Sequence, residues 1–152
     1  MIRRTLGQLE KMIKVDRISS PSLEIGIRGV SIDSRKVEKG NLFVPLQGEK
    51  ADGHQFVQTA IENGAAASFW QKDVPNPPEN LPLIFVDDTL AALQELARSY
   101  RSELDIKVVG ITGSNGKTTT KDMTASLLSL KYKVQKTEGN YNNHIGLPLS
   151  IL

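Results

Sequence analysis

Apolar residues in the first hundred positions fall into short runs that polar turns separate. Four of these runs have the alternating or continuous apolar pattern of strands, at residues 25–32, 42–46, 65–70 and 83–86. Three others repeat apolar residues at helical spacing and predict helices, at residues 5–13, 55–63 and 89–100. Because strands alternate with helices along the chain, the pattern indicates an α/β fold.

Glycine and proline positions refine these predictions. Gly29 interrupts the first strand and predicts a bulge there. Gly64 is expected to end the helix at 55–63 in a left-handed conformation. Pro45 predicts that its strand either lies at a sheet edge or ends early. Within the helix at 55–63, we expect Phe56 to face inward.

The pattern changes after a polar stretch at 101–105, where we place a boundary between a domain at 1–102 and a second at 103–152. The second part predicts a single βαβ unit, with a strand at 107–112, a helix at 117–130 and a strand at 132–137. The apolar run at 147–152 predicts a further helix. A parallel sheet needs several such units to cover both faces, so we expect the front part of a longer protein.

The composition excludes several classes of protein. The 152 residues include 19 Lys and Arg against 17 Asp and Glu, and the resulting net charge of +2 is dispersed, so no nucleic-acid or membrane partner is expected. The absence of cysteine excludes disulfides, thiolate zinc sites, iron–sulfur clusters and cysteine nucleophiles. No apolar run approaches the ~18 residues of a membrane span, and no signal peptide is apparent. The default expectation is a cytoplasmic protein.

A glycine-rich loop at 110–119 carries the strongest chemical signal, with the sequence GITGSNGKTT between a predicted strand and a predicted helix. Glycines let backbone N–H groups point at phosphate oxygens, and the helix N-terminus adds partial positive charge. Lys117 would neutralise the β- and γ-phosphates, and the Thr118 hydroxyl would ligate Mg²⁺. The general P-loop pattern requires glycine where Ile111 stands, so this loop is a variant. The alternative is an ordinary turn in which Lys117 is merely solvated.

Three blocks together resemble a known family. The segment TGSNGKTTTKDM at 112–123 resembles the ATP loop of the Mur ligases of peptidoglycan synthesis. The segment from Asp33-Ser34-Arg35 to Asp52-Gly53-His54 resembles the UDP-sugar-binding domain of that family. The segment GNYNNHIGLPL at 139–149 is most similar to the family member that adds D-Ala-D-Ala.

The resemblance implies a mixed α/β UDP-substrate domain at 1–102, followed by the start of a P-loop, parallel-sheet ATPase domain at 103–152. It also implies ATP-dependent amide formation, in which UDP-MurNAc-tripeptide is activated as an acyl phosphate and D-Ala-D-Ala displaces phosphate. Because the family has further domains, we expect this chain not to be catalytically competent by itself. We expect it to be monomeric.

The same resemblance assigns roles to individual residues. Lys117 would be catalytic and would stabilise the charge on the transferring phosphoryl group, while Thr118 would reach Mg²⁺. Ser34 and Arg35 match positions near the uridine diphosphate, and 49–51 match a region beside the uracil. Two asparagines, Asn142 and Asn143, match residues that face the UDP-sugar substrate across a cleft between domains. The ATP phosphates would be held by Gly113, Ser114, Asn115, Gly116, Lys117, Thr118 and Thr119.

Simpler interpretations remain open for these residues. Ser34 and Arg35 could belong to a plain Asx-type turn, and the asparagines at 140–143 to a polar turn. His54 could cap a helix, and Lys121 and Asp122 could form a solvated helix face. For the whole protein, the alternatives are a diaminopimelate- or lysine-adding ligase, a folylpolyglutamate synthase or a regulatory P-loop module. A further alternative is a UDP-sugar-binding domain followed by a partly disordered segment.

Overall fold

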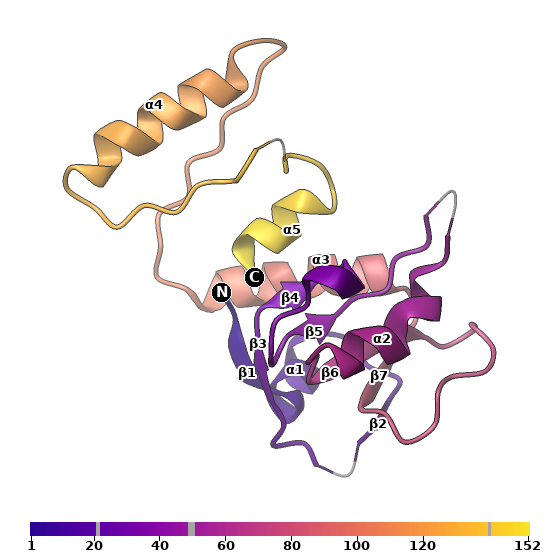
Figure 1. The fold of residues 1–152 in the computed structure, drawn as a ribbon. Coiled ribbons are helices and arrows are strands. Elements are labelled where there is room, and N and C mark those ends of the chain that lie inside the picture. The colour runs from indigo at the N-terminus through magenta and orange to yellow at the C-terminus, as the bar shows by residue number, and fades with distance from the viewer. Residues whose placement is uncertain (21, 49–50, 140) are drawn as a thin grey trace.

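The computed structural model describes residues 1–20, 22–48, 51–139 and 141–152. Its centre is a five-stranded sheet in the order β2-β7-β6-β5-β4 (Figure 1). Four strands run parallel, namely β4 (Val30–Ser31), β5 (Leu42–Phe43), β6 (Ala67–Gln71) and β7 (Leu83–Val86). At one edge β2 (Arg17–Ser19) pairs antiparallel with β7. The predicted α/β fold with parallel strands is therefore confirmed.

A second, two-stranded sheet joins β1 (Arg3–Thr5) to β3 (Gly26–Arg28) in antiparallel register. Gly29, at φ +72°, separates β3 from β4, and these two strands belong to different sheets. The single strand with a bulge predicted at 25–32 is therefore wrong, although the chain does break at the predicted glycine. The sequence analysis did not predict β1 or β2. Both are three-residue strands that contain arginine with serine or threonine, and so neither shows an apolar alternation.

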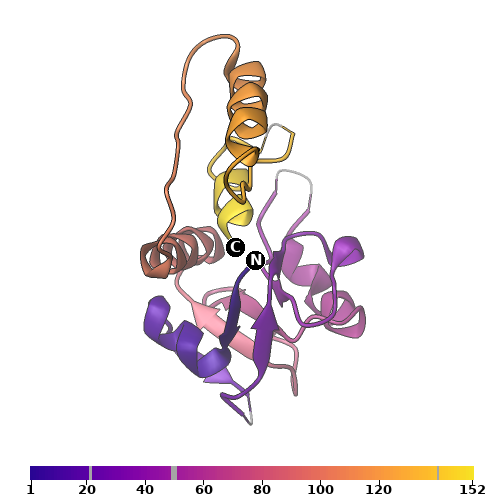
Figure 2. The ribbon, with the colours of Figure 1, turned by 90° about the vertical axis from the view of Figure 1, so that its left-hand side faces the viewer.

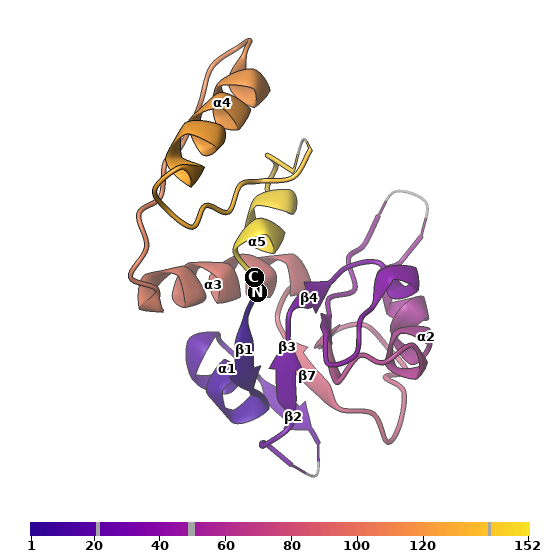
Figure 3. The same ribbon diagram turned by 60° about the vertical axis from the view of Figure 1, so that its left-hand side comes forward.

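Helices cover both faces of the large sheet (Figure 3). On one face lie α1 (Leu6–Met12) and α3 (Thr89–Glu103), and on the other lies α2 (Val57–Glu62). Alternate residues of β6 divide between two apolar clusters, because Phe69 packs with α1 and α3 while Trp70 packs with α2. This burial on both faces is typical of parallel sheets.

Local signals set the ends of several elements. Thr5 and Gln8 form a reciprocal capping box at the start of α1. The helix predicted at 55–63 begins as a 3₁₀ turn (Gly53–Phe56) and continues as α2, and Gly64 follows with φ +113°. Phe56 is 42% exposed, so the expectation that it faces inward is wrong; the 3₁₀ turn changes the helical phase before α2 starts. Pro45 follows a strand that ends early, at Phe43, within the sheet rather than at its edge.

The second part of the chain consists of helices and extended segments. The predicted helices are confirmed as α4 (Lys117–Ser129) and α5 (Gly146–Ile151). The strands predicted at 107–112 and 132–137 are wrong, because no strand is present after β7 among the described residues. A strand requires a hydrogen-bonded neighbour. Val108 and Val109 instead lie 63% and 61% exposed in an extended segment that runs up to the glycine loop (Figure 2).

The last helix returns to the first part of the chain. In all views α5 lies against α3, and Leu152 is buried in the same apolar cluster as α1 and α3 (Figures 1 and 3). The backbone N–H of Ile2 donates to the carbonyl oxygen of Leu152, and Gln94 Nε2 donates to the carbonyl oxygen of His144 at 3.0 Å. Within the described ranges, no helix combines the length and apolarity needed to cross a membrane.

Candidate active site

The glycine loop forms an exposed bend directly before α4. Gly113 and Gly116 have φ angles of +148° and +75°, in a region that side-chain-bearing residues rarely adopt. Gly116 is the N-cap residue of α4 and offers no side chain to cap the N–H groups of the first turn. These N–H groups point out of the helix N-terminus, which favours anions. The bend therefore places the uncapped N–H groups of a helix start at an exposed position, an arrangement that favours an anion.

Lys117 places a cation over this bend. Its Nζ donates to the carbonyl oxygens of Gly113 and Ser114, at 2.5 and 3.5 Å. The side chain thus folds back over the loop instead of extending into solvent as the simpler interpretation supposed. A phosphate group in the bend would meet both this ammonium group and the helix N-terminus.

The other predicted loop residues are exposed. Ser114 and Asn115 form the outer part of the bend, and Thr118 and Thr119 start the first turn of α4. A Thr118 hydroxyl at a helix start can ligate a magnesium ion that phosphate oxygens also hold. In the part of the chain that the structure describes, no three His, Asp or Glu side chains gather into a metal site.

Ser34 and Arg35 lie in a 3₁₀ turn (Ser34–Lys36) just after β4. Asp33 caps this turn by accepting from the backbone N–H of Arg35 at 3.0 Å, which is the Asx-type turn considered as the simpler interpretation. The turn packs on α2's end, because Asn63 Nδ2 donates to the carbonyl oxygen of Ser34 at 2.9 Å. Ser34 is buried, whereas the Arg35 side chain is 84% exposed.

The Arg35 guanidinium binds the Asp33 carboxylate in a bidentate pair, with Nε–Oδ1 and Nη2–Oδ2 distances of 2.9 and 2.8 Å. The side-chain hydrogen bond from Arg35, followed by the backbone hydrogen bond of the same residue, lowers the pKa of Asp33 to about 2. Asp33 is therefore ionised at neutral pH and orients a guanidinium whose side chain stays largely exposed. Such a group can bind a phosphate anion.

Asn142 and Asn143 are exposed and precede α5. The Asn143 Oδ1 accepts from the backbone N–H groups of Ile145 and Gly146, at 3.1 and 2.7 Å. Asn143 thus supports the start of α5 through its oxygen.

The structure does not bring the predicted site residues into one cluster. Within the described residues, no hydrogen bond or ion pair links the glycine loop to Ser34 and Arg35 or to Asn142 and Asn143. In Figures 1 and 3, α4 stands away from the sheet, and α5 lies between α4 and α3. Glu49, Lys50 and Asn140, which belong to the blocks that carry the resemblance, lie outside the described residues.

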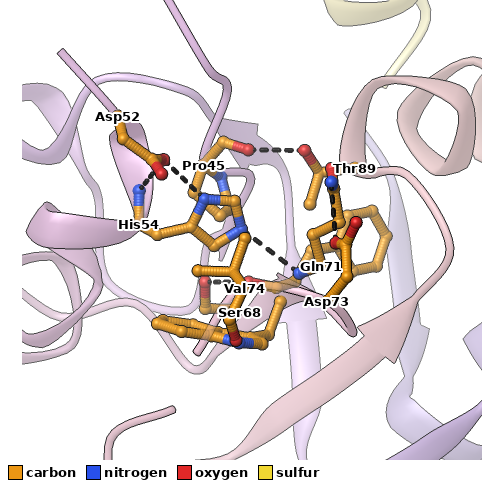
Figure 4. A network of polar contacts seen from close by, with 10 residues as sticks. Pro45, Asp52, His54, Ser68, Gln71, Asp73, Val74 and Thr89 are labelled. Carbon is orange, nitrogen blue, oxygen red and sulfur yellow. Dashed lines mark hydrogen bonds and ion pairs between the residues drawn. The ribbon is translucent and has the colours of Figure 1, made fainter. Parts of the chain in front are cut away.

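His54 forms a buried network that the sequence analysis did not predict (Figure 4). Its Nδ1 lies 2.6 Å from Asp52 Oδ1, and its Nε2 accepts from the backbone N–H of Gln71 at 3.2 Å. The ring therefore carries its proton on Nδ1, and its edge meets Trp70 at 4.9 Å between centroids. Burial raises the pKa of Asp52, but the hydrogen bonds from His54 outweigh burial and hold that pKa below its usual value.

Lys121 and Asp122 also differ from the solvated helix face considered for them. The Lys121 side chain is only 20% exposed and donates to the carbonyl oxygens of Thr137 and Gly139. Asp122 pairs with Lys136 at 2.6 Å, and this hydrogen bond lowers the pKa of Asp122. Lys117 and Lys121 are four residues apart, which is the sequence signal that places both side chains on the same face of α4.

Two family profiles cover most of the chain. The profile described as "Mur ligase family, catalytic domain" matches residues 26–101, and the one described as "Mur ligase middle domain" matches residues 111–152. The chain therefore belongs to the Mur ligase family. This finding confirms the resemblance that the sequence blocks suggested.

Curated relatives of the chain carry the name UDP-N-acetylmuramoyl-tripeptide–D-alanyl-D-alanine ligase. The relative from Bacillus subtilis is 54% identical over 100% of this chain and 33% of its own length. The one from Escherichia coli is 39% identical over 100% of this chain and 32% of its own length. The chain thus spans about a third of the length of these relatives.

Solved structures agree with this assignment. A crystal structure of MurF from Acinetobacter baumannii matches with a TM-score of 0.87 at 31% identity, over 99% of this chain and 33% of that chain. The MurF ligase from Thermotoga maritima in complex with ADP matches with a TM-score of 0.70 at 40% identity, over 82% of this chain and 28% of that chain.

Proposed function

We propose that this chain supplies the UDP-substrate-binding part and the phosphate loop of an ATP-dependent ligase that adds D-alanyl-D-alanine to UDP-N-acetylmuramoyl-tripeptide. The observation that carries the proposal is the bend at Gly113 to Gly116, with uncapped N–H groups behind it and the Lys117 ammonium over it. The names of the curated relatives supply the reaction. In the proposed enzyme, residues 1–102 form the UDP-substrate domain and residues 103–152 begin the ATP domain.

The proposed reaction has two steps. The terminal carboxylate of the tripeptide attacks the γ-phosphorus of ATP, a bond forms between carboxylate oxygen and phosphorus, and ADP leaves. The amine of D-Ala-D-Ala then attacks the acyl carbon, phosphate leaves with the electron pair of the broken C–O bond, and the nitrogen releases a proton to give the amide. Because phosphoryl transfer depends mainly on positioning and charge stabilisation, a cupped loop with one ammonium group suits the first step.

Lys117 would move from the carbonyl oxygens of Gly113 and Ser114 to the phosphate oxygens, where it would stabilise the charge on the transferring group. The residues from Gly113 to Thr119 would hold the phosphates. A magnesium ion held in part by Thr118 would offset phosphate charge. Arg35, which Asp33 orients at the exposed turn after β4, would bind the diphosphate of the UDP-substrate, with Ser34 beside it. Asn142 and Asn143 would contact the same substrate.

The Thermotoga maritima relative, which is 40% identical over 82% of this chain, was solved in complex with ADP, and this supports an adenine nucleotide as a ligand of the proposed enzyme. The proposal also keeps the cytoplasmic location and the monomeric state expected from the sequence. Size-exclusion chromatography with light scattering would measure the latter.

The test is a Lys117→Ala substitution in the full-length ligase that carries this sequence. We expect amide formation to fall by about a thousandfold or more, because one preorganised charge contact in such a site is worth about 10²–10³ in rate and lysine also binds the phosphates. Binding of UDP-MurNAc-tripeptide, measured by calorimetry, should stay within about twofold. Lys133→Ala, which changes an exposed lysine after α4, is the matched control. A near-normal rate in the Lys117 variant would refute the role of the loop.

A substrate panel tests the identity of the reaction. The unmodified ligase should turn over D-Ala-D-Ala with UDP-MurNAc-tripeptide, and it should not turn over meso-diaminopimelate, lysine or glutamate. Turnover with a single amino acid but not with the dipeptide would replace the proposed activity with that of another amide ligase.

A further inference from the structure

Lys121 lies one helical turn beyond Lys117 on α4, and most of its side chain is buried. Its Nζ donates to the carbonyl oxygens of Thr137 at 2.7 Å and Gly139 at 3.2 Å. The Asp122 carboxylate is 3.8 Å away. The Lys121 side chain is only 20% exposed, so its ammonium group has lost hydration and rotational freedom. Its charge-assisted hydrogen bonds replace that hydration and hold the two carbonyl oxygens in place.

A second ion pair lies at the start of the same segment. Lys136 Nζ lies 2.6 Å from Asp122 Oδ1, but the two side chains are 48% and 46% exposed, so this pair contributes little to holding the segment on α4. The segment then turns, with Gly139 at φ +51° and the Tyr141 N–H donating to the Glu138 carbonyl oxygen at 3.2 Å.

The turn leads directly into the two asparagines and then into α5. A Cβ placed on Gly146 would lie 2.6 Å from Tyr141 Cα, so the start of α5 packs closely against this turn. Asn143 Oδ1 binds the N–H groups of Ile145 and Gly146. Since α5 also packs on α3, a continuous series of contacts joins the helix of the glycine loop to the first part of the chain.

We propose that Lys121 is a positioning residue: it fixes the 137–139 segment to α4 and thereby sets the place of Asn142 and Asn143 relative to the phosphate loop. The ligand that this arrangement serves is the UDP-sugar substrate, so the inference rests on the proposed function. Lys121 touches no substrate. It acts through two main-chain oxygens, and removal of its N–H donors releases the turn that carries the asparagines.

A positioning role differs in its effects from a catalytic or a merely structural one. Asn142 and Asn143 would contact the UDP-sugar equally before and during the reaction, so their displacement raises KM for that substrate. The phosphate loop is held by its own backbone and by Lys117, so KM for ATP changes little. A general loss of stability would instead reduce the amount of active enzyme and leave both KM values unchanged.

The experiment compares Lys121→Met with Lys136→Met in the full-length ligase that carries this sequence. Both variants remove an ammonium group from the same cluster, but only the first removes the donors to Thr137 and Gly139. We expect Lys121→Met to raise KM for UDP-MurNAc-tripeptide about tenfold and KM for ATP less than about twofold, with the Lys136 variant near wild type. Equal changes in both variants, or in both KM values, would overturn the proposal.

Amide hydrogen exchange on the same proteins without substrate gives a second readout. The N–H groups of Tyr141, Ile145 and Gly146 should exchange faster in Lys121→Met than in Lys136→Met, and those of α3 should not change. If the methionine variant fails to fold, Lys121→Arg replaces it, since arginine keeps N–H donors but cannot reproduce a compact ammonium group. If these three amides exchange at the wild-type rate in Lys121→Arg, the result supports a role for the N–H donors. If amides throughout the protein exchange faster than in wild type, the result overturns the proposal. If the unmodified ligase shows no dipeptide-dependent turnover, the proposed function fails, and the exchange data alone decide the positioning role.

Discussion

At Gly53 the backbone passes close to Leu46. A Cβ at this position would lie 2.7 Å from the Leu46 nitrogen and 2.8 Å from its carbonyl oxygen, and both are main-chain atoms. The same approach allows the Gly53 N–H to donate to the Leu46 oxygen at 2.9 Å. The glycine thus closes the loop that places Asp52 and His54 for their buried network.

The substitution Gly53→Ala should lower the free energy of unfolding by about 2 kcal/mol, because backbone atoms cannot move aside for the added methyl group. Urea unfolding followed by circular dichroism measures this. Gly26→Ala is the matched control, since an added Cβ there meets nothing within 4 Å. Equal stability of the two variants would show that the loop adjusts without cost.

Asp33 should titrate far below an ordinary aspartate. Its pKa of about 2 lies below the usual 3.8, so the stabilisation from its contacts is fully present above pH 3.8 and is lost as the pH falls through 2. Arg35→Gln should raise this pKa toward 3.8, while Lys36→Gln should change it little, because Lys36 is the smallest contributor. An NMR titration of the Asp33 carboxyl carbon measures both. An unchanged pKa in the Arg35 variant would contradict the bidentate pair.

At the scale of elements, sequence patterns predicted the helices and strands whose formation depends on local interactions. The helix α3 has an Asp88 cap and a repeating apolar face, and both are visible in the sequence. The strands predicted at 107–112 and 132–137 failed because apolar character alone does not supply a hydrogen-bonded neighbour. In the same way, the edge strand β2 exists because β7 offers it a partner, although its own sequence gives no strand signal.

The N-cap of α3 therefore tests whether a local hydrogen bond sets the start of the helix. Asp88 Oδ1 accepts from the Ala91 N–H at 2.6 Å, and Asp88→Ala should cost about 1 kcal/mol of unfolding free energy. Denaturant unfolding is the measurement. Asp105→Ala, at an exposed position just after α3, should leave stability within about 0.5 kcal/mol of wild type. A cost below that of the control would mean that tertiary packing alone sets the start of α3.

At the scale of the whole molecule, apolar burial is uneven. Six residues of α3 are buried, whereas α4 has none, and Met123, Leu127 and Leu130 on or next to α4 are largely exposed. Amides of α4 should therefore exchange with solvent faster than those of α3, because few apolar contacts oppose local opening. Hydrogen exchange with mass spectrometry on this chain measures the difference. Equal protection of the two helices would indicate that α4 is covered in solution.

The candidate site contains some features that the sequence predicts and others that it does not. The glycine loop could be predicted because its residue types act through local backbone geometry, and Gly113 and Gly116 have that geometry. The contacts of Lys121 with residues 16 and 18 positions later, and of His54 with a residue 17 positions later, depend on how segments meet in space. No spacing in the sequence encodes those contacts, so the sequence could not predict them.

Trp70 is the single tryptophan of the chain, and its ring meets the edge of His54 at 4.9 Å. Ultraviolet emission from this protein consequently originates beside an imidazole rather than beside the glycine loop. Fluorescence would follow any opening of the structure around that histidine, whereas a ligand bound at the glycine loop would be nearly invisible to it. An engineered tryptophan at Thr119 would give the loop an optical signal of its own.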